Sequence, residues 1–463
     1  MKQLIGFLAG VALLAACGQT PSAGVPGSDS TAVTAGSEAR DGLEPQALAS
    51  LCLISPLDNT FGGCGKKFTG IGPNGNPNVR HADTTALAIQ PDGKLLVAGL
   101  MYASNARGLI IRLNTNGSVD SSFANTGFQR INPEENRLPI IKKIIVQPDG
   151  KILVSGQDLS IGILQRLNAD GSYDTGFSSP FNGQLGGSGQ TMALQPDGKI
   201  VLNEYPDDSV VGGDDQMHLF RYNPDGSRDL SFSSAATQVP RNSSYNASVH
   251  VAPSGRIIVT GRFDSEVRAM AFTSTGVVDP SFATAGTKVV IPARYKFFVD
   301  PLTGRPRVQT TPCGITNSIQ QADGKILVSG ACGNPADNKT FIMGRINADG
   351  SSDLSFGTSG VKYEPSLPEM RALAVQPNGN IVVGGTENND FLLARFNSTG
   401  VRDTVWGGSG KVSTGFSTRA GIIPVDSIGA LVTSSDGKII AAGASRIIGP
   451  VDPVGFAIAR YKP

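Results

Sequence analysis

The sequence predicts an all-β protein, a seven-bladed β-propeller whose last blade is closed by an N-terminal strand. Three observations lead to this fold class. A unit of short apolar strands and tight turns recurs seven times, the seventh unit stops before its last strand, and the missing piece stands in front of the first unit. The composition agrees, because 58 glycines in 463 residues suit a fold with many tight turns.

Each unit begins with two apolar runs around a tight turn. The first copy, residues 86–99, reads ALAIQPDGKLLVAG, in which Pro-Asp-Gly is a strong turn signal between two β-rich runs. A third run at 109–114 and a second turn at Asn116-Gly117 follow. The first turn recurs at Pro91, Pro148, Pro196, Pro253, Ala322, Pro377 and Ser435. Units of four short strands at this spacing indicate propeller blades rather than a solenoid.

The two ends of the repeat region complement each other. The seventh unit reaches its third strand at 456–461, and its tail and fourth strand are found instead at 57–61 and 65–68. We therefore expect the N-terminal segment to add the outermost strand to the last blade. Such a closure leaves only short, protected sheet edges.

The repeated phrase is similar to that of a known family. Residues 147–177 contain QPDGKILVSG and RLNADGSYDTGF, and this phrase resembles the delta-60 repeat of bacterial secreted and surface proteins. The resemblance extends over residues 50–463. It implies a β-propeller of unknown function, and it brings no catalytic residues.

The first residues predict an exported lipoprotein. Residues 1–16 have a positive start at Lys2 and an uncharged apolar stretch, which is typical of a secretory signal and too short to span a bilayer. Leu14-Ala15-Ala16-Cys17 resembles the bacterial lipobox, which implies that Cys17 is lipidated and becomes the first mature residue; an ordinary signal peptide is the alternative.

The segment after Cys17 reads as a spacer. Residues 17–49 are rich in Gly, Ser, Ala, Thr and Pro and predict a flexible tether, so the propeller is expected at 50–463. We expect a protein lipid-anchored in the cell envelope. If the cell has an outer membrane, Gly18 in place of an inner-membrane retention Asp favours the outer membrane or the cell surface.

Three side chains recur in the units at fixed places. An Asp recurs at Asp58, Asp120, Asp174, Asp229, Asp279, Asp353 and Asp403. An aromatic residue follows three positions later at Phe61, Phe123, Phe177, Phe232, Phe282, Phe356 and Trp406. An Arg ends the third strand at Arg112, Arg166, Arg221, Arg345, Arg395 and Arg460, whereas the fourth unit has Ala271. Because a ligand rarely binds seven times, we expect Arg and Asp to pair within or between blades while the aromatic ring fills the gap between sheets.

The four cysteines after Cys17 fit an oxidising compartment. Cys313 and Cys332 flank one hairpin symmetrically, and Cys52 and Cys64 flank the donated segment. Of the three pairings open to four cysteines, we expect Cys313–Cys332 and Cys52–Cys64. Unpaired buried thiols are the alternative.

The candidate ligand site lies in the irregular loops. Strand order puts both repeated turns on one face and the long segments 203–216, 291–316, 331–339 and 444–454 on the other, where binding usually resides. The second strand ends in Gly in six units but in Glu204 in the third. Carboxylates follow at Asp207, Asp208, Asp214 and Asp215, and a basic insertion contains Arg294, Lys296, Arg305 and Arg307. These are either solvated loops or a cation or ligand site that uses Glu204 and its neighbours.

Signals for catalysis and cofactors are few. His81, His218 and His250 lie far apart and lack metal-ligand spacing. The turn at 168–174, NADGSYD, offers oxygen ligands for calcium, but Asn and Asp also favour turns by themselves. We therefore expect no cofactor, with calcium as the one alternative.

The function expected from these features is binding. A net charge of +1 and 17% charged residues exclude a nucleic-acid footprint. We expect a monomeric surface-displayed module for a glycan or protein ligand. An envelope hydrolase or lyase that uses carboxylates at the central channel, or a structural envelope-assembly partner, is the alternative.

Overall fold

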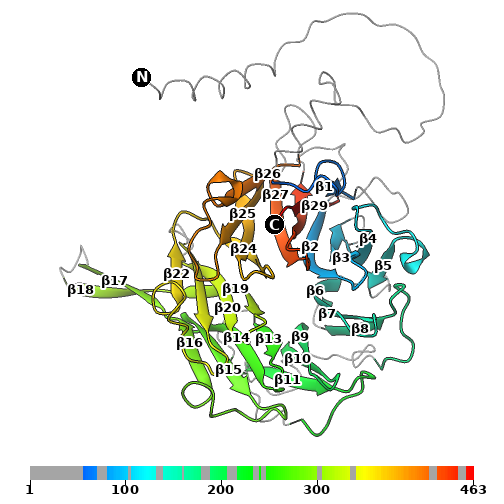
Figure 1. Ribbon diagram of the computed structural model, residues 1–463. Coiled ribbons are helices and arrows are strands. Elements are labelled where there is room, and N and C mark those ends of the chain that lie inside the picture. Colours follow the sequence, from blue (N-terminus) through cyan, green and yellow to red (C-terminus); the bar gives the residue numbers. More distant parts are fainter. Residues whose placement is uncertain are drawn as a thin grey trace, which may run out of the picture. The chain divides into compact units, whose positions relative to one another are not determined.

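The computed structural model confirms the seven-bladed β-propeller, with seven antiparallel sheets arranged around a central channel (Figure 1). It describes residues 56–69, 81–102, 106–131, 139–158, 161–178, 188–205, 216–232, 239–240, 247–299, 305–333, 340–416, 425–446 and 455–463. Within these ranges, no helix is long and apolar enough to cross a membrane. Cys17 and the predicted tether lie outside them.

The first four blades follow the chain in order. Blade one contains β2 (His81–Ile89), β3 (Leu95–Tyr102), β4 (Ala106–Leu113) and β5 (Phe128–Ile131). Blade two contains β6 (Pro139–Val146), β7 (Ile152–Asp158) and β8 (Ile161–Leu167). Blade three contains β9 (Ser188–Leu194), β10 (Ile200–Tyr205), β11 (Gln216–Tyr222) and β12 (Val239–Pro240). Blade four contains β13 (Ser248–Val251), β14 (Ile257–Phe263), β15 (Glu266–Phe272) and β16 (Thr287–Ile291).

The remaining blades complete the ring. Blade five contains β19 (Cys313–Gln320), β20 (Ile326–Cys332), β21 (Thr340–Ile346) and β22 (Val361–Glu364). Blade six contains β23 (Met370–Val375), β24 (Ile381–Glu387), β25 (Asp390–Phe396) and β26 (Lys411–Thr414). Blade seven contains β27 (Val425–Thr433), β28 (Ile439–Arg446), β29 (Phe456–Tyr461) and β1 (Lys66–Phe68). Short 3₁₀ turns, η2 (Phe123–Asn125) and η4 (Trp406–Gly408), carry two of the repeated aromatic residues.

The N-terminal closure is also confirmed. Strand β1 pairs antiparallel with β29, with Lys67 opposite Ile458, and so forms the outer edge of the last blade. Nε of Arg460 donates a hydrogen bond to Asp58 at 2.8 Å, which adds an ion pair between the first and last parts of the propeller. The N-terminal segment therefore supplies the fourth strand of the last blade.

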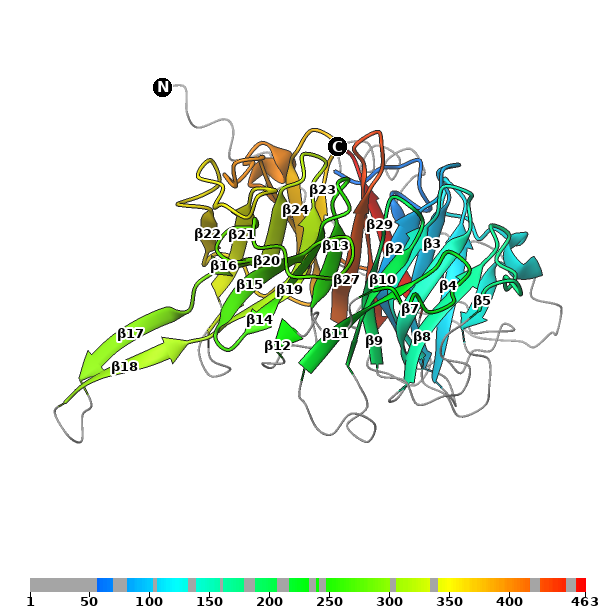
Figure 2. The ribbon, with the colours of Figure 1, turned by 90° about the horizontal axis from the view of Figure 1, so that it is seen from below.

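One hairpin does not belong to any blade. Strands β17 (Arg294–Val299) and β18 (Pro306–Thr311) form a two-stranded sheet between blades four and five. The hairpin projects away from the ring (Figure 2). It accounts for much of the basic insertion expected at 291–316.

The repeated Arg joins two blades at once. In blade one, Nε of Arg112 donates to Asp120 at 2.8 Å, and Nη1 donates to the carbonyl oxygen of Ala169 in blade two at 2.6 Å. The guanidinium also lies over the Phe123 ring, with Cζ 4.7 Å from its centroid. We call this set of contacts the clasp. The same ion pair joins Arg166 to Asp174, Arg221 to Asp229, Arg345 to Asp353, Arg395 to Asp403, and Arg460 to Asp58.

Blade four keeps its clasp by another route. Ala271 stands where the other blades have Arg, but Arg256 from the first turn takes over the contacts. Its Nε donates to Asp279 at 2.7 Å, and its Nη1 donates to the carbonyl oxygen of Ala348 in blade five at 2.9 Å. Blades one, two, three, five and seven have Lys at the position of Arg256. The exception in the repeat therefore moves the arginine from the third strand to the first turn and leaves the clasp intact.

The repeated aromatic ring packs against a glycine of the next blade. Gly171, in the second turn of blade two, has φ +89°, and a Cβ there would lie 2.6 Å from the Phe123 ring. Equivalent pairs are Phe177 with Gly226, Phe232 with Gly276, Phe282 with Gly350, Phe356 with Gly400, and Phe61 with Gly117. Each ring thus fills the space that the missing side chain leaves, as dense packing requires.

The junction of blades six and seven lacks this glycine. In blade seven, the N-terminal tail lies beside the end of β29, where Leu57 forms an isolated β-bridge with Tyr461. The aromatic residue of blade six is Trp406, the one Trp in the chain, and its ring centroid lies 6.5 Å from that of Tyr461. The larger indole occupies the site where the other junctions have phenylalanine against a turn.

Candidate functional site

The inner strands of all seven blades surround a cavity at the ring centre. Its volume is about 400 Å³, and β2, β6, β9, β13, β19, β23 and β27 each contribute lining residues. A cavity of this size is within the range of ligand sites in proteins. We call it the channel cavity.

A β-bulge shapes the inner strand of six blades. In blade two, Ile141 is opposite Gly156 and Lys143 is opposite Ser155, so Lys142 is an extra residue without a partner. The extra residues of other blades are Thr85, Thr316, Arg371 and Gly429, and in blade three Gln190 and Thr191 face Asn203. A bulge re-aims side chains locally. Here it brings one position per bulged blade to a similar level of the channel.

In five of the six bulged blades, the bulge accounts for the repeated glycine of the second strand. Gly261 of blade four, whose inner strand has no bulge, makes only ordinary contacts. A Cβ on Gly99 would collide with the carbonyl oxygen of Asp83, and one on Gly156 would collide with that of Ile140. Blade three differs because its register puts Gly189 opposite Glu204, so the glycine of this pair lies on the inner strand. A side chain at position 204 is therefore compatible with the backbone of blade three, because the residue opposite it is a glycine.

Three cations face the channel cavity without an acidic partner. Lys142 is half-buried, and Lys143 and Arg371 are exposed to the channel. Among the described residues, none of the three makes a salt bridge, and no Asp or Glu lines this cavity. Protein surrounds the channel, so the limited access of water lowers the pKa of both lysines. The site is therefore positively charged and lacks a counter-charge from the described chain.

A neutral histidine lies in the same cavity. Nε2 of His250 and Oγ of Ser318 are 2.6 Å apart, and Ser318 Oγ lies 2.7 Å from Thr260 Oγ1. Burial, together with the charge of Lys143, lowers the pKa of His250 to about 3. The imidazole is neutral at physiological pH and links blades four and five through Ser318. It adds no positive charge to the channel.

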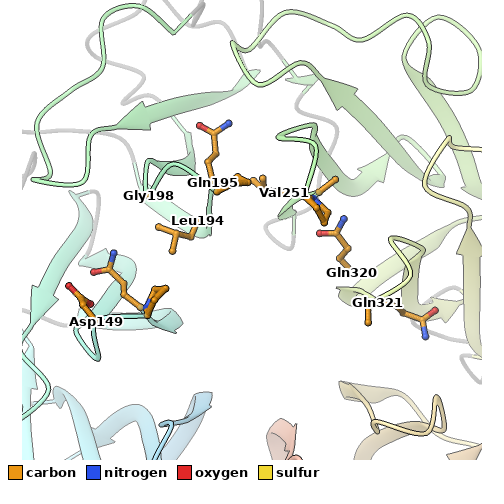
Figure 3. A pocket seen from close by; sticks show the side chains of 13 residues that line it. Asp149, Leu194, Gln195, Gly198, Val251, Gln320 and Gln321 are labelled. Atoms are coloured by element: carbon orange, nitrogen blue, oxygen red, sulfur yellow. The ribbon is translucent and has the colours of Figure 1, made fainter.

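The face of the repeated turns is hollowed beside the channel mouth. A cavity of about 620 Å³ is lined by the first turns of blades two to five (Figure 3). Three of its residues, Gln147, Gln320 and Gln321, each have a buried side-chain amide atom without a hydrogen-bond partner in the described structure. The turn face therefore offers polar groups of its own, although the sequence argument placed binding on the opposite face.

The residues expected to form an acidic cluster are only partly described. Glu204 lies on β10, is 4% exposed, and accepts a hydrogen bond from the Tyr222 hydroxyl. Burial raises the pKa of Glu204 to about 7. Asp207, Asp208, Asp214 and Asp215 lie outside the described residues, and the described part of the chain contains no cluster of three or more His, Cys, Asp or Glu side chains that could hold a metal ion.

The structure bears on the predicted disulfides and on the positions of two histidines. Cys313 and Cys332 form a disulfide between opposite residues of β19 and β20, as predicted. Cys64 is disulfide-bonded, and its expected partner Cys52 lies outside the described residues. His218 is buried, stacks on Phe220 and does not line the channel cavity. Among the described residues, His250 is the one histidine that lines this cavity.

Sequence reasoning missed the channel cations. Lys142 and Lys143 interrupt the otherwise apolar β6, which reads PIIKKIIV, and two adjacent charges break the alternation expected of a half-buried strand. That interruption was the available signal. That Arg371 of blade six lines the same cavity depends on ring closure and on bulge register.

Comparisons with known proteins agree with the fold. The model of the family described as "Domain of unknown function (DUF5122) beta-propeller" matches residues 90–123, 147–177, 195–232, 321–356 and 376–404. These ranges fall in blades one, two, three, five and six. No curated protein matches.

Solved structures with similar folds are distant. The polysaccharide lyase Uly1 is 12% identical with a TM-score of 0.45, covering 83% of this chain and 90% of that one. A polysaccharide lyase family PL25 ulvan lyase is 12% identical with a TM-score of 0.41, covering 82% and 94%. A protein of unknown function from Dyadobacter fermentans is 10% identical with a TM-score of 0.38, covering 83% and 95%. Similarities of this size indicate nothing about activity.

Proposed function

We propose that this chain is a lipid-anchored binding module of the cell envelope, whose propeller takes part of a glycan or protein ligand into the channel cavity. One observation carries the proposal. The clasp repeats nearly unchanged around the ring, whereas the residues that face the channel differ from blade to blade, among them Thr85, Lys142, Arg371 and Gly429. A surface that varies on a constant frame is where specific binding is expected.

The frame supports this role because it is preorganised. Strand β1 closes the ring, and the clasps join neighbouring blades through hydrogen bonds from buried guanidinium groups. A ligand that enters such a channel orders few additional side chains, so less of its interaction energy is lost on binding.

The proposed location rests on the first residues of the sequence. The run Leu14-Ala15-Ala16-Cys17 and the Gly- and Ser-rich segment after it support a lipid anchor followed by a spacer. A propeller held this way would meet glycans and proteins at the membrane surface. Display on the outer membrane or cell surface is proposed where the cell has an outer membrane.

The arrangement around His250 fits binding better than hydrolysis. Retaining and inverting glycosidases generally use two carboxyl groups, and the described lining of the channel cavity contributes hydroxyl, amide, imidazole and cationic groups. The His250 imidazole is occupied by Ser318, which in turn contacts Thr260.

The test has two parts. Cells that express the wild type, Cys17→Ser or the spacer variant Ser28→Ala are fractionated, and only Cys17→Ser should be released from membranes. Purified full-length lipoprotein in detergent is then screened against a glycan array and an envelope-protein extract. Specific retention without turnover supports the proposal. Equal membrane attachment of all three proteins, or cleavage of a retained polysaccharide, would overturn it.

A further inference from the structure

The channel cations differ from the lysines of the first turns, because no carboxylate among the described residues pairs with them. In the first turns, Lys94 lies 3.0 Å from Asp120, Lys151 lies 2.9 Å from Asp174, and Lys199 lies 2.7 Å from Asp229. Each of these lysines shares the carboxylate of its own clasp with the clasp arginine. Lys142, Lys143 and Arg371 have no such partner among the described residues. Among the described residues, these first-turn lysines therefore have an acidic partner, whereas the three channel cations have none.

We propose that the channel cavity binds the acidic group of a glycan, a carboxylate or a sulfate ester, between Lys142, Lys143 and Arg371. This inference rests on the proposed binding function and names the ligand class for the same cavity. Lysine and arginine donate charge-assisted hydrogen bonds to such oxyanions, which are about twice as strong as neutral ones. The three cations lie on the inner strands of blades two and six.

Unpaired cations inside a protein carry an energetic cost. The low access of water disfavours the charged form of both lysines, as the direction of their pKa shifts shows. An anion bound between them would offset that cost. The cavity is therefore suited to negative charge before any ligand enters.

The other lining groups favour a saccharide over an acidic protein segment. Thr85, Thr191, Ser248, Thr316 and Asn317 add hydroxyl and amide groups to the channel cavity. The hydroxyls of Thr85, Thr191 and Thr316 donate to carbonyl oxygens of the protein and can accept hydrogen bonds from sugar hydroxyls. The volume of about 400 Å³ suits a chain end better than a folded partner.

The turn-face hollow supplies further unpartnered groups next to the channel. Amide atoms of Gln147, Gln320 and Gln321 are buried there without partners in the described structure (Figure 3). Buried polar atoms are nearly always satisfied, by protein, water or ligand. A glycan that continues from the channel to this face would meet amide donors and acceptors along its path.

The experiment compares charged and neutral versions of the same polymer. Purified full-length lipoprotein in detergent is tested by biolayer interferometry against polygalacturonate and its methyl ester, and against dextran sulfate and dextran. Polyglutamate serves as the acidic peptide, and inorganic sulfate as a competitor. Comparison of the carboxylate and sulfate arms shows which oxyanion the site prefers.

Matched charge variants locate the binding. Lys142→Gln with Lys143→Gln removes two channel charges, and Lys67→Gln with Lys288→Gln removes two charges from the outermost strands β1 and β16. We expect the channel variant to bind the acidic glycan about tenfold or more weakly. The control should stay within about twofold because Lys67 and Lys288 lie half-buried on the outermost strands and do not line the channel cavity. Unchanged thermal unfolding of both variants shows that the fold is intact.

The outcomes separate this inference from the proposed function. Equal binding of charged and neutral polymers, or equal losses in both variants, overturns the anion site and leaves the binding module standing. Tighter binding of polyglutamate than of either acidic glycan overturns the glycan assignment. If no polymer binds but the envelope screen finds another ligand, only this inference fails. If neither experiment detects a ligand, the proposed function fails with it.

Discussion

The bond that a clasp arginine makes to the next blade can be measured by comparing blades five and six. Arg345 donates to Asp353 at 2.7 Å and to the carbonyl oxygen of Ser398 in blade six at 2.6 Å. Arg395 donates to Asp403 at 2.9 Å, but the described residues give it no carbonyl partner in blade seven. Both guanidinium groups lie over an aromatic ring. The two arginines therefore differ in the bond between blades and in the exposure of their aspartate, and Nη1 of Arg395 also donates to the side-chain oxygen of Gln376 at 3.5 Å.

The expected magnitudes follow from burial. In Arg345→Ala, the side chain of Asp353 is 6% exposed and keeps only Lys325 at 3.3 Å as a cation. Removing one partner of such a buried pair costs about 3–5 kcal/mol. Asp403 is 21% exposed, so solvent screens its charge, and Arg395→Ala should cost about 1–2 kcal/mol. At an unfolding entropy of about 2 cal/mol/K per residue, these losses lower Tm by about 4–6 °C and about 1–2 °C.

The assay is thermal unfolding followed by calorimetry and far-UV circular dichroism at neutral pH. Arg345→Lys serves as a second comparison, because it keeps the charge but loses the planar fork that reaches both partners. We expect its Tm to lie between those of the wild type and Arg345→Ala. Equal losses in Arg345→Ala and Arg395→Ala would show that the bond between blades adds nothing measurable and would refute the reasoning.

Four further predictions concern single features. Burial raises the pKa of Glu204 to about 7 from its ordinary 4.5, so the folded state binds its proton more tightly. The contribution of Glu204 to stability should therefore be fully present below pH 4.5 and decrease by about 3 kcal/mol as the pH rises to 7, a decrease that Glu204→Gln should lack; parallel pH profiles of Tm for the wild type and this variant would contradict it. Trp406→Phe should lower stability by about 1–2 kcal/mol through a cavity between blades six and seven, as chemical denaturation can measure. Replacing Cys313 and Cys332 by Ser should cost about 3 kcal/mol through the lost loop constraint, and a denaturation midpoint equal to that of the oxidised wild type would contradict it. Deleting residues 56–69 removes β1 and exposes the edge of β29, so light scattering should show aggregation, and a deletion that stays monomeric and melts normally would be evidence against the closure.

The blade number and the closure were predictable because they depend on local chemistry. Pro-Asp-Gly or a closely similar turn marks the first hairpin of every unit. The tail at 57–61 has the same pattern of residues as the tails inside the chain. The Cys313–Cys332 disulfide was predictable for the same reason, since a hairpin turn fixes which residues face each other. Each of these features needs only neighbouring residues or a repeated phrase.

The remaining features depend on tertiary register. Arg256 replaces the missing arginine of blade four from the first turn, so a comparison of the third strands alone shows only Ala271 in place of arginine. The extra residues Lys142 and Arg371 face the channel because their strands bulge opposite Gly156 and Gly385. The repeated glycine was visible in the sequence, but its cause was not, because the colliding carbonyl belongs to the neighbouring strand.

The division of labour within a blade explains how one frame can carry different ligands. The clasp residues lie in the turns and at the strand ends, where they contact the next blade, and substitution of an arginine such as Arg345 leaves a buried carboxylate with only a first-turn lysine as a cation. The bulge residues have no partner across the strand pair, so Thr85, Lys142, Thr316, Arg371 and Gly429 can differ without loss of a ladder hydrogen bond. Stability is therefore held by residues that repeat, and charge in the channel is set by residues that do not. It follows that replacing Lys142 or Arg371 by a neutral side chain should lower the free energy of unfolding far less than replacing any clasp arginine. A loss of binding in such variants then reports on the ligand site and not on the fold.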